Sequence, residues 1–533
     1  MKKKTTYVLL LSSLVTLTIV VVLVLNSYTG FSLIDNDANT GVQPDNYYQR
    51  GSLDETSEGK KVSLKVKEYA CGTSIEKRNQ FITEYTIPIP CTQPVGIAVD
   101  SLNKVWIGAT WIGYLIVFDP RSETFADFIK IPNWLTKGTF GSFIWGMEFD
   151  KKGNLWFTDQ VNNAIWKYEN STKRFEMYVI PTRGSYPVQV AFDSKGNVWF
   201  SEIFGKKIGV VEPHKAKNGT SEGITEYELT QIDFETMGPI SIGKNDTVWL
   251  TAVSFPEAGN IVKFNPTTKD FTVFDLPKGI GVPVGITEDD YGRVWVNDHA
   301  TNLFLMFDPS KNTVKKYSTS LPTSRNSTTT LPYWNEVRGS KVWFNEHEGN
   351  AIGYYDFANQ TLVEYQIPTR SVVWGNTSNP LRFALDDTNS VWFTEWTENR
   401  IGLLNSSKYG NLPIYITVSK DSIHLNKSNL KSESIDVSVY PNTSKLTEAV
   451  KMTVAGSMSQ SGRLWNLTEK FSEDSFRFLN NTDSLIKGTP QMPHIVSLTL
   501  SPTADLLEGN YTLTIGARYG PLTYSKIVNL QVS

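Results

Sequence analysis

Residues 283–317 read PVGITEDDYGRVWVNDHATNLFLMFDPSKNTVKKY, and they contain one complete unit of a repeat. Within the unit, residues 283–287, 293–297, 302–308 and 313–317 are rich in β-branched and aromatic side chains. Asp, Gly, Asn and Pro separate these segments. This composition predicts four short β-strands joined by tight turns.

The centre of the unit is a tryptophan between two hydrophobic residues, and it recurs at intervals of 43–50 residues. The seven tryptophans are Trp106, Trp156, Trp199, Trp249, Trp295, Trp343 and Trp392. A period of about 40–50 residues with several short strands in each unit is typical of a β-propeller. A four-stranded blade has two faces to cover, so we expect each tryptophan to pack against the neighbouring blade. The sequence therefore predicts an all-β fold whose main part is a seven-bladed β-propeller over residues 67–408.

The ends of the repeat indicate how the propeller closes. The seventh unit contains three strands, at residues 380–383, 391–394 and 400–404, and lacks an outer one. An additional outer strand, TEYTIP at residues 83–88, precedes the first unit and matches VEYQIP at residues 363–368. We predict that this N-terminal strand completes the seventh blade, because that pairing removes two exposed sheet edges.

The N-terminus predicts a membrane anchor. Three lysines precede residues 7–25, which contain no charge and are long enough to span a bilayer as a helix. The basic flank predicts a cytoplasmic N-terminus and an extracytoplasmic body at the cell surface. A cleaved signal peptide is the alternative for residues 1–25, although no Ala-x-Ala site follows them. The polar residues 26–66 are expected to form a spacer, with the membrane as a partner through residues 7–25.

Cysteine, glycosylation and charge patterns agree with this location. Cys71 and Cys91 flank the closing strand and are predicted to form a disulfide, with two buried free thiols as the alternative. The net charge of −3 and the lack of basic clusters beyond the N-terminus argue against a nucleic-acid partner. Twelve Asn-x-Ser/Thr sequons, a modest excess over composition, are consistent with a glycoprotein: Asn170, Asn218, Asn245, Asn326, Asn359, Asn376, Asn405, Asn426, Asn442, Asn466, Asn480 and Asn510.

The repeat ends after Asn405, and residues 409–533 form a second predicted domain. Seven alternating runs in this region suit an immunoglobulin-like β-sandwich without its disulfide. They are residues 414–418, 435–440, 450–455, 476–479, 495–500, 511–517 and 526–532. The stretch GNYTLTI at residues 509–515 resembles late strands of Ig-like modules on bacterial and archaeal surface proteins. Such modules act as spacers or adhesive units, so we expect no catalysis there.

Several phrases of the repeat resemble the streptogramin B lyase (virginiamycin B lyase) family. They are VWFSE at residues 198–202, WFTE at residues 392–395, NRIG at residues 399–402 and EYQIP at residues 364–368. The resemblance covers residues 81–405 and implies a seven-bladed propeller. It also implies a Mg²⁺-dependent lyase that opens a cyclic depsipeptide by elimination at the ester linkage. A base near neutrality would remove the proton while a metal and an acid stabilise the oxyanion.

This chain has other residues at the positions of the family's catalytic residues. Its two histidines follow the proline of the inner strand in the last two blades, where this chain has Tyr333 and Leu381. The family's glutamate position falls at Trp396. Across the seven repeats the position after that proline holds Val95, Trp145, Val188, Ile240, Val284, Tyr333 and Leu381.

A series of carboxylates provides the other candidates. Three residues after the conserved tryptophans lie Asp159, Glu202, Asp298, Glu346 and Glu395, in five of seven repeats. One interpretation is that each carboxylate accepts hydrogen bonds within its turn. The other is that Asp159, Glu202, Asp298 and Glu395, with Tyr333 and Trp396, bind a cation or a polar ligand at one mouth of the channel.

Two of these carboxylates precede histidines at equivalent turns of adjacent repeats, His299 and His347. His299, His347 and Glu346 are therefore the candidate catalytic residues, as a neutral base or a mixed nitrogen–oxygen metal site. Two solvent-exposed turn histidines are the alternative. Two functions remain open: a surface propeller that binds a small molecule, glycan or peptide, and a lyase or hydrolase. Mg²⁺ is expected only for the lyase, and the sequence names no other cofactor or metal.

Overall fold

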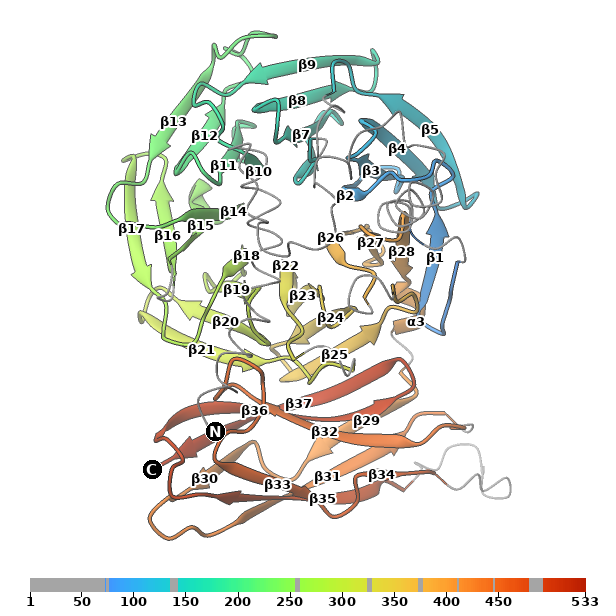
Figure 1. Cartoon of the computed structure of the whole chain (residues 1–533), viewed down its shortest axis with the longest axis vertical. Helices are drawn as coiled ribbons and strands as arrows, with labels where there is room; N and C mark the ends of the chain where they lie inside the picture. Colours follow the sequence, from blue (N-terminus) through green and yellow to red (C-terminus); the bar gives the residue numbers. More distant parts are fainter. Residues whose placement is uncertain are drawn as a thin grey trace, which may run out of the picture. The chain divides into compact units, whose positions relative to one another are not determined.

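The structure is a computed structural model and describes residue 72 and residues 76–134, 142–254, 259–323, 328–371, 377–409, 412–443, 446–478 and 492–533. The chain divides into two compact units. Unit 1 comprises Met1–Ser74, Ile87–Glu228 and Thr397–Asn399, and unit 2 comprises Ile75–Thr86, Leu229–Trp396 and Arg400–Ser533. Each unit is built from β-sheets, and all named strand pairs are antiparallel except β30 with β37 in unit 2, so the predicted all-β fold is confirmed (Figure 1).

Unit 1 contains the first three repeats, and each forms a four-stranded sheet whose strands follow one another in chain order. The first sheet contains β2 (Pro94–Val99), β3 (Val105–Ala109), β4 (Tyr114–Asp119) and β5 (Thr124–Lys130). The second contains β6 (Met147–Phe149), β7 (Leu155–Asp159), β8 (Ala164–Glu169) and β9 (Arg174–Val179). The third contains β10 (Pro187–Phe192), β11 (Val198–Glu202), β12 (Lys207–Val211) and β13 (Ile224–Glu228).

Unit 2 contains the other four repeats and the C-terminal domain. The fourth sheet contains β14 (Thr236–Ile242), β15 (Val248–Val253), β16 (Asn260–Asn265) and β17 (Asp270–Asp275). The fifth contains β18 (Pro283–Glu288), β19 (Val294–Asp298), β20 (Leu303–Asp308) and β21 (Thr313–Ser318), close to the predicted bounds. The sixth contains β22 (Pro332–Arg338), β23 (Lys341–Glu346), β24 (Ala351–Asp356) and β25 (Thr361–Gln366). The seventh contains β26 (Pro380–Leu385), β27 (Val391–Glu395), β28 (Arg400–Leu404) and β1 (Ile82–Thr86).

The seventh sheet confirms the predicted closing strand. β1 pairs with β28 in an antiparallel register that runs from Ile82 opposite Leu404 to Thr86 opposite Arg400. The Glu84 carboxylate lies 3.6 Å from the Arg400 guanidinium, and both side chains are fully buried. A strand from the N-terminal part of the chain therefore occupies the outer edge of this sheet.

The conserved tryptophans pack between neighbouring sheets, as predicted. In unit 1, Trp156 lies in one hydrophobic cluster with Val198 and Phe200 of the third sheet. In unit 2, Trp295 of the fifth sheet stacks on Phe357, with ring centroids 5.7 Å apart. In five repeats the indole nitrogen of the conserved tryptophan donates to an aspartate at the preceding turn, as Trp295 does to Asp289 at 2.9 Å. In the fourth repeat, Trp249 donates instead to Glu288 of the fifth sheet at 2.6 Å. The apolar ring thus covers the adjacent sheet while its one donor is satisfied.

A bulge recurs at the start of the inner strands. In the sixth sheet the register shifts between Pro332 and Asn335, and in the seventh between Pro380 and Phe383. The two residues after the proline therefore lie outside the ladder, and such bulges turn side chains toward new surroundings. In the fourth sheet Met237, opposite Ala252, takes the place of the proline. The position that follows it is Gly238, so the assignment of Ile240 to this position was wrong.

The C-terminal domain consists of two sheets. One contains β29 (Ile414–Val418), β31 (Glu433–Pro441), β35 (His494–Pro502) and β33 (Leu467–Phe471). The other contains β30 (Ser422–Leu425), β37 (Leu522–Val532), β36 (Gly509–Tyr519), β32 (Val450–Gly456) and β34 (Ser475–Phe476). Strands β30 and β33 are additional to the seven predicted runs, and the Ig-like assignment stays a prediction.

The C-terminal domain shares a sheet with the sixth repeat. β37 pairs with the outer strand β25, from Thr361 opposite Lys526 to Tyr365 opposite Leu522. The sixth sheet and the second sheet of the C-terminal domain thus form one nine-stranded sheet. The sequence predicted a domain boundary near residue 408 but not this pairing across it.

Some predictions lie outside the described residues. They concern the anchor at residues 7–25, the spacer at residues 26–66, Cys71 and the sequons at Asn326, Asn376 and Asn480. The disulfide between Cys71 and Cys91 therefore stays a prediction. Within the described ranges, no helix has both the length and the hydropathy needed to cross a membrane.

Candidate functional site at two adjacent histidines

Equivalent turns in the fifth and sixth sheets position His299 and His347. Each histidine directly follows the last residue of the second strand of its sheet. The backbone N–H of His299 donates to the carbonyl of Val282 at 2.8 Å, and that of His347 donates to Leu331 at 3.0 Å. The same hydrogen bond to the segment before the inner strand fixes both turns, which confirms their predicted equivalence.

The two imidazoles are in contact. His347 Nδ1 lies 3.3 Å from His299 Nε2, and the ring planes differ by 3° with centroids 5.2 Å apart. One of these nitrogens must donate and the other accept. Relative exposures of 8% for His299 and 7% for His347 show that the rings are buried. The alternative of two solvent-exposed turn histidines is therefore wrong.

Burial keeps both histidines neutral. The pKa of His299 is lowered to about 3, first by burial and then by the charge of His347. Burial also lowers the pKa of His347 to about 4. Neither ring is protonated at neutral pH, and each is a much weaker base than an ordinary imidazole.

Aromatic and cationic side chains extend the pair. The ring of Tyr333 meets that of His299 edge to face at 4.7 Å. The next residue, Trp334, has the guanidinium of Arg382 over its ring at 3.9 Å. Burial lowers the pKa of Arg382 to about 10, so this side chain stays cationic at neutral pH. Tyr333 and Trp334 are only half-buried, and both come from the bulge of β22.

Hydrogen bonds from neighbouring protein groups occupy the carboxylates of Asp298 and Asp159. Asp298 accepts hydrogen bonds from the N–H groups of Gly281 at 2.9 Å and Val282 at 2.6 Å, and from Thr301 Oγ1 at 2.8 Å. In unit 1, Asp159 accepts from Asn162 Nδ2 at 2.7 Å and from Trp166 Nε1 at 2.9 Å. Both carboxylates are fully buried. Their geometry fits the structural interpretation, and ligand binding by them stays a prediction.

Two glutamates of the series, Glu346 and Glu202, lie near a second carboxylate. Burial and the charge of Glu364 raise the pKa of Glu346 well above its usual range. In unit 1, burial and Glu226 raise the pKa of Glu202 to about 8, while Lys207 opposes them. Glu395 is fully buried and Trp396 is nearly so, with its backbone N–H on the carbonyl of Asn379 at 3.3 Å. Of the predicted site residues, the structure brings His299, His347 and Tyr333 together.

Comparison with known proteins agrees with this fold. The sequence profile of the virginiamycin B lyase family matches residues 79–303 and residues 150–373, which together span more than half of the chain. The chain belongs to the virginiamycin B lyase family. None of the curated proteins compared with it matches.

Two solved structures of the virginiamycin B lyase family show the same propeller fold. One is a streptogramin B lyase, with 22% identity, a TM-score of 0.50 and coverage of 61% of this chain and 97% of its own. The other is a catalytically inactive virginiamycin B lyase from Staphylococcus aureus with quinupristin, with 23% identity and a TM-score of 0.50. It covers 60% of this chain and 98% of its own.

The residues around the histidine pair do not fit the Mg²⁺ that the virginiamycin B lyase family implies. Mg²⁺ prefers an octahedral set of oxygen ligands. The pair offers imidazole nitrogens, while the oxygens of Asp298 are bound to backbone amides and Glu346 lies against Glu364. Over the described residues, no group of three or more His, Cys, Asp or Glu side chains is arranged to hold a metal.

Sequence reasoning missed two arginines. Arg382 lies two residues after the proline of its inner strand, where the first and fifth sheets have Gly96 and Gly285. A basic residue at a position that is otherwise small was a usable signal. Arg518 of β36 faces Glu346 and Glu364 from the C-terminal domain. No spacing in the sequence connects it to the sixth repeat.

Proposed function

We propose that the chain is a membrane-anchored, extracytoplasmic β-propeller that binds a ligand and does not act as a lyase. The proposal takes the seven sheets as the blades of one propeller and residues 7–25 as its anchor. The site that we propose centres on Tyr333 and Trp334. The ligand class is a small molecule, a glycan or a peptide.

The state of the two histidines carries this proposal. A general base works best when its pKa lies near the working pH. The pKa values of His299 and His347, about 3 and about 4, leave both rings too weakly basic to remove a proton efficiently at neutral pH. At the positions of the family's histidines, Leu381 has no ionisable group, and burial raises the pKa of Tyr333, so neither side chain supplies a base at neutral pH.

The surroundings of Tyr333 support ligand binding instead. Half-buried aromatic rings with a cation beside them offer flat contact area for sugars and peptides. Trp334 is held in place by Arg382 below its ring, and the backbone N–H of Trp334 donates to Asn345 Oδ1 at 2.9 Å. The aromatic surface is thus positioned before a ligand arrives, which reduces the entropic cost of binding.

A binding screen tests the proposal. The full-length chain is applied to a glycan array and a peptide library, and each hit is measured by calorimetry. Trp334→Leu is expected to weaken the hit about tenfold. Trp465→Leu is the matched control, because Trp465 is 64% exposed in the C-terminal domain. Equal affinity of the two variants would show that the ligand binds elsewhere.

The lyase function remains the second candidate, because the chain belongs to the virginiamycin B lyase family and its histidine pair touches Tyr333. Quinupristin is incubated with the full-length chain and Mg²⁺ and followed by reversed-phase chromatography. Elimination opens the ring without a change of mass, whereas hydrolysis adds one water. Turnover that disappears in His347→Ala would favour the lyase over our proposal.

A further inference from the structure

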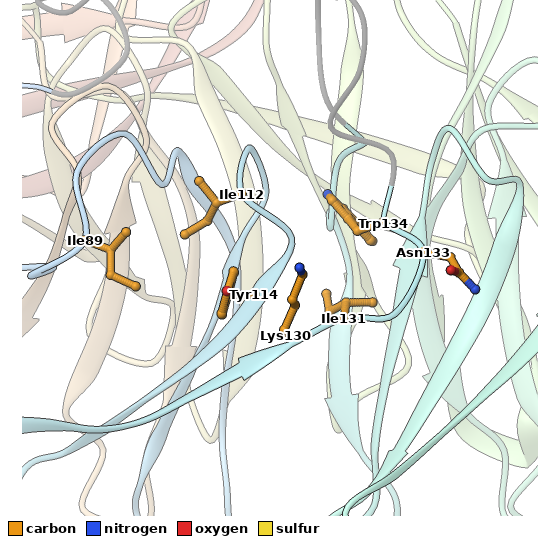
Figure 2. A pocket seen from close by; sticks show the side chains of 7 residues that line it. All are labelled: Ile89, Ile112, Tyr114, Lys130, Ile131, Asn133 and Trp134. Carbon is orange, nitrogen blue, oxygen red and sulfur yellow. The ribbon is translucent and has the colours of Figure 1, made fainter. Parts of the chain in front are cut away.

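A separate pocket lies at one end of the first sheet, in unit 1. Its volume is about 490 Å³, and it is lined by Ile89, Ile112, Tyr114, Lys130, Ile131, Asn133 and Trp134 (Figure 2). This volume is typical of small-molecule sites. Tyr114 begins β4 and pairs with Lys130, the last residue of β5. The pocket therefore lies where β4 starts and β5 ends.

The wall of the pocket is fixed by a close contact. Trp134 is 8% exposed and donates its indole N–H to the carbonyl of Thr110 at 2.9 Å. A side chain on Gly113 would come within 2.4 Å of the Trp134 ring, and Gly113 has a φ of +70°. Only glycine combines that conformation with so close an approach. The backbone N–H of Ile131 also donates to the Gly113 carbonyl, at 2.9 Å. Trp134 and Ile131 thus form a preorganised apolar wall.

The polar groups of the pocket are few and available. In the described part of the chain, we find no hydrogen bond or ion pair that occupies the Tyr114 hydroxyl, the Lys130 ammonium or the Asn133 amide. Lys130 is the one charged residue of the lining, and no carboxylate accompanies it. Figure 2 shows Lys130 between Tyr114 and Ile131, beside the apolar wall.

We propose that this pocket binds a small amphiphilic anion, in which an apolar body carries a single carboxylate. Three isoleucines and Trp134 bury the apolar body, since apolar contact supplies most of the free energy of such binding. The carboxylate lies at Lys130, with the neighbouring Tyr114 hydroxyl as a hydrogen-bond donor. This site is distinct from Tyr333 and Trp334 and does not depend on the function proposed above.

Isothermal titration of the full-length chain tests the site with two probes that have the same alkyl chain. Decanoate and decyltrimethylammonium are titrated below their micelle concentrations. Decanoate is expected to bind several-fold more tightly than the cation. Lys130→Gln should weaken decanoate about two- to fivefold, as expected for a solvent-exposed charge pair. Lys130→Glu should reverse the preference between the two probes.

Two further variants separate the apolar part of the site from unspecific effects. Ile112→Ser should weaken both probes about tenfold, because it removes apolar contact. Lys151→Gln, an exposed lysine outside the pocket, should leave both affinities unchanged. The proposal is overturned if decanoate does not bind, or if Lys130→Gln and Ile112→Ser leave its affinity unchanged. Equal affinity of the wild-type chain for both probes would overturn the anionic class.

Discussion

A buried histidine pair joined by one hydrogen bond needs a nitrogen that accepts, so full protonation breaks it. His299 and His347 have folded-state pKa values of about 3 and about 4, below the value of 6.5 for an unperturbed histidine. The unfolded chain therefore binds more protons than the folded chain below pH 6.5. The stability that the neutral pair contributes is present above pH 6.5 and is lost as the pH falls toward 3.

We expect His347→Asn to make unfolding less sensitive to acid, because asparagine retains a polar atom near the position of Nδ1 but does not titrate. The melting temperature should fall less between pH 7 and pH 4.5 in this variant than in the wild type. His214→Asn is the control, since His214 is exposed in a loop. Equal acid sensitivity of all three proteins would contradict the buried neutral pair.

The Glu202 carboxyl is expected to respond to pH with the opposite sign. Its pKa is raised from 4.5 to about 8, mainly by burial, so the folded chain binds more protons than the unfolded chain. Its contribution to stability is complete below pH 4.5 and is lost as the pH rises through 8. Glu202→Gln should match the wild type at pH 5 and exceed its melting temperature at pH 8. Exposed Glu222→Gln should show no such crossover.

The sequence predicted which histidines share equivalent turns but not their environment. The repeat period alone aligned His299 with His347, since both follow the second strand by the same number of residues. Their burial depends on Tyr333 from a bulge and on the segment near Leu331. The proline that marks this bulge recurs in most repeats, but it does not show which side chains the bulge places against the histidines. The site could therefore be located from the sequence, but its pKa values could not be anticipated.

A recurring glutamate joins the outer strand of one sheet to the end of the preceding sheet. Glu84 accepts from the N–H of Thr369 at 2.8 Å, and Glu364 accepts from the N–H of Ser320 at 2.8 Å. In unit 1, Glu226 accepts from the N–H of Thr182 at 2.8 Å. This hydrogen bond explains why Glu-Tyr recurs in the outer strands. The sequence alone showed the recurrence but not its cause.

We expect the ion pair of Arg400 to hold the closing strand in place. Arg400 is fully buried, contacts Glu84 and donates to Thr369 Oγ1 at 2.7 Å. Arg400→Met would leave Glu84 as a buried carboxylate without its cation, at a cost of about 3–5 kcal/mol. Amide exchange measured by mass spectrometry should increase in β1 and β28.

Lys207→Met in the third sheet is the matched comparison for Arg400→Met. Lys207 lies 3.2 Å from Glu226, but its side chain is 24% exposed. Water can replace this cation in part, so the expected cost is about 1 kcal/mol or less. If both variants lost the same stability, burial of the pair would not determine its contribution.

The C-terminal domain completes the sixth sheet in two ways. Its strand β37 covers the outer edge of β25, which would otherwise present unpaired backbone groups. The domain also supplies a cation. In the third and seventh sheets the first residue of the third strand is a cation, Lys207 or Arg400, whereas in the sixth sheet this residue is Ala351. Arg518 lies near Glu346 and Glu364 in its place. Local patterns in the sequence predicted both domains. They could not predict these contacts between the domains, because the residues that meet are more than 150 positions apart.

We therefore expect Arg518→Met to destabilise the sixth sheet together with the C-terminal domain. Arg518 Nη2 donates to the Leu321 carbonyl at 3.3 Å, and its charge opposes the raised pKa of Glu346. Because the side chain is only partly enclosed, the expected loss is about 1–3 kcal/mol. Exposed Arg463→Met in the same domain is the control. Calorimetry should show one shared transition for both regions, and amide exchange should rise in β25 and β37 alike. A separate transition for residues 409–533, with β25 unaffected, would mean that the domain is only attached to the propeller and does not complete it.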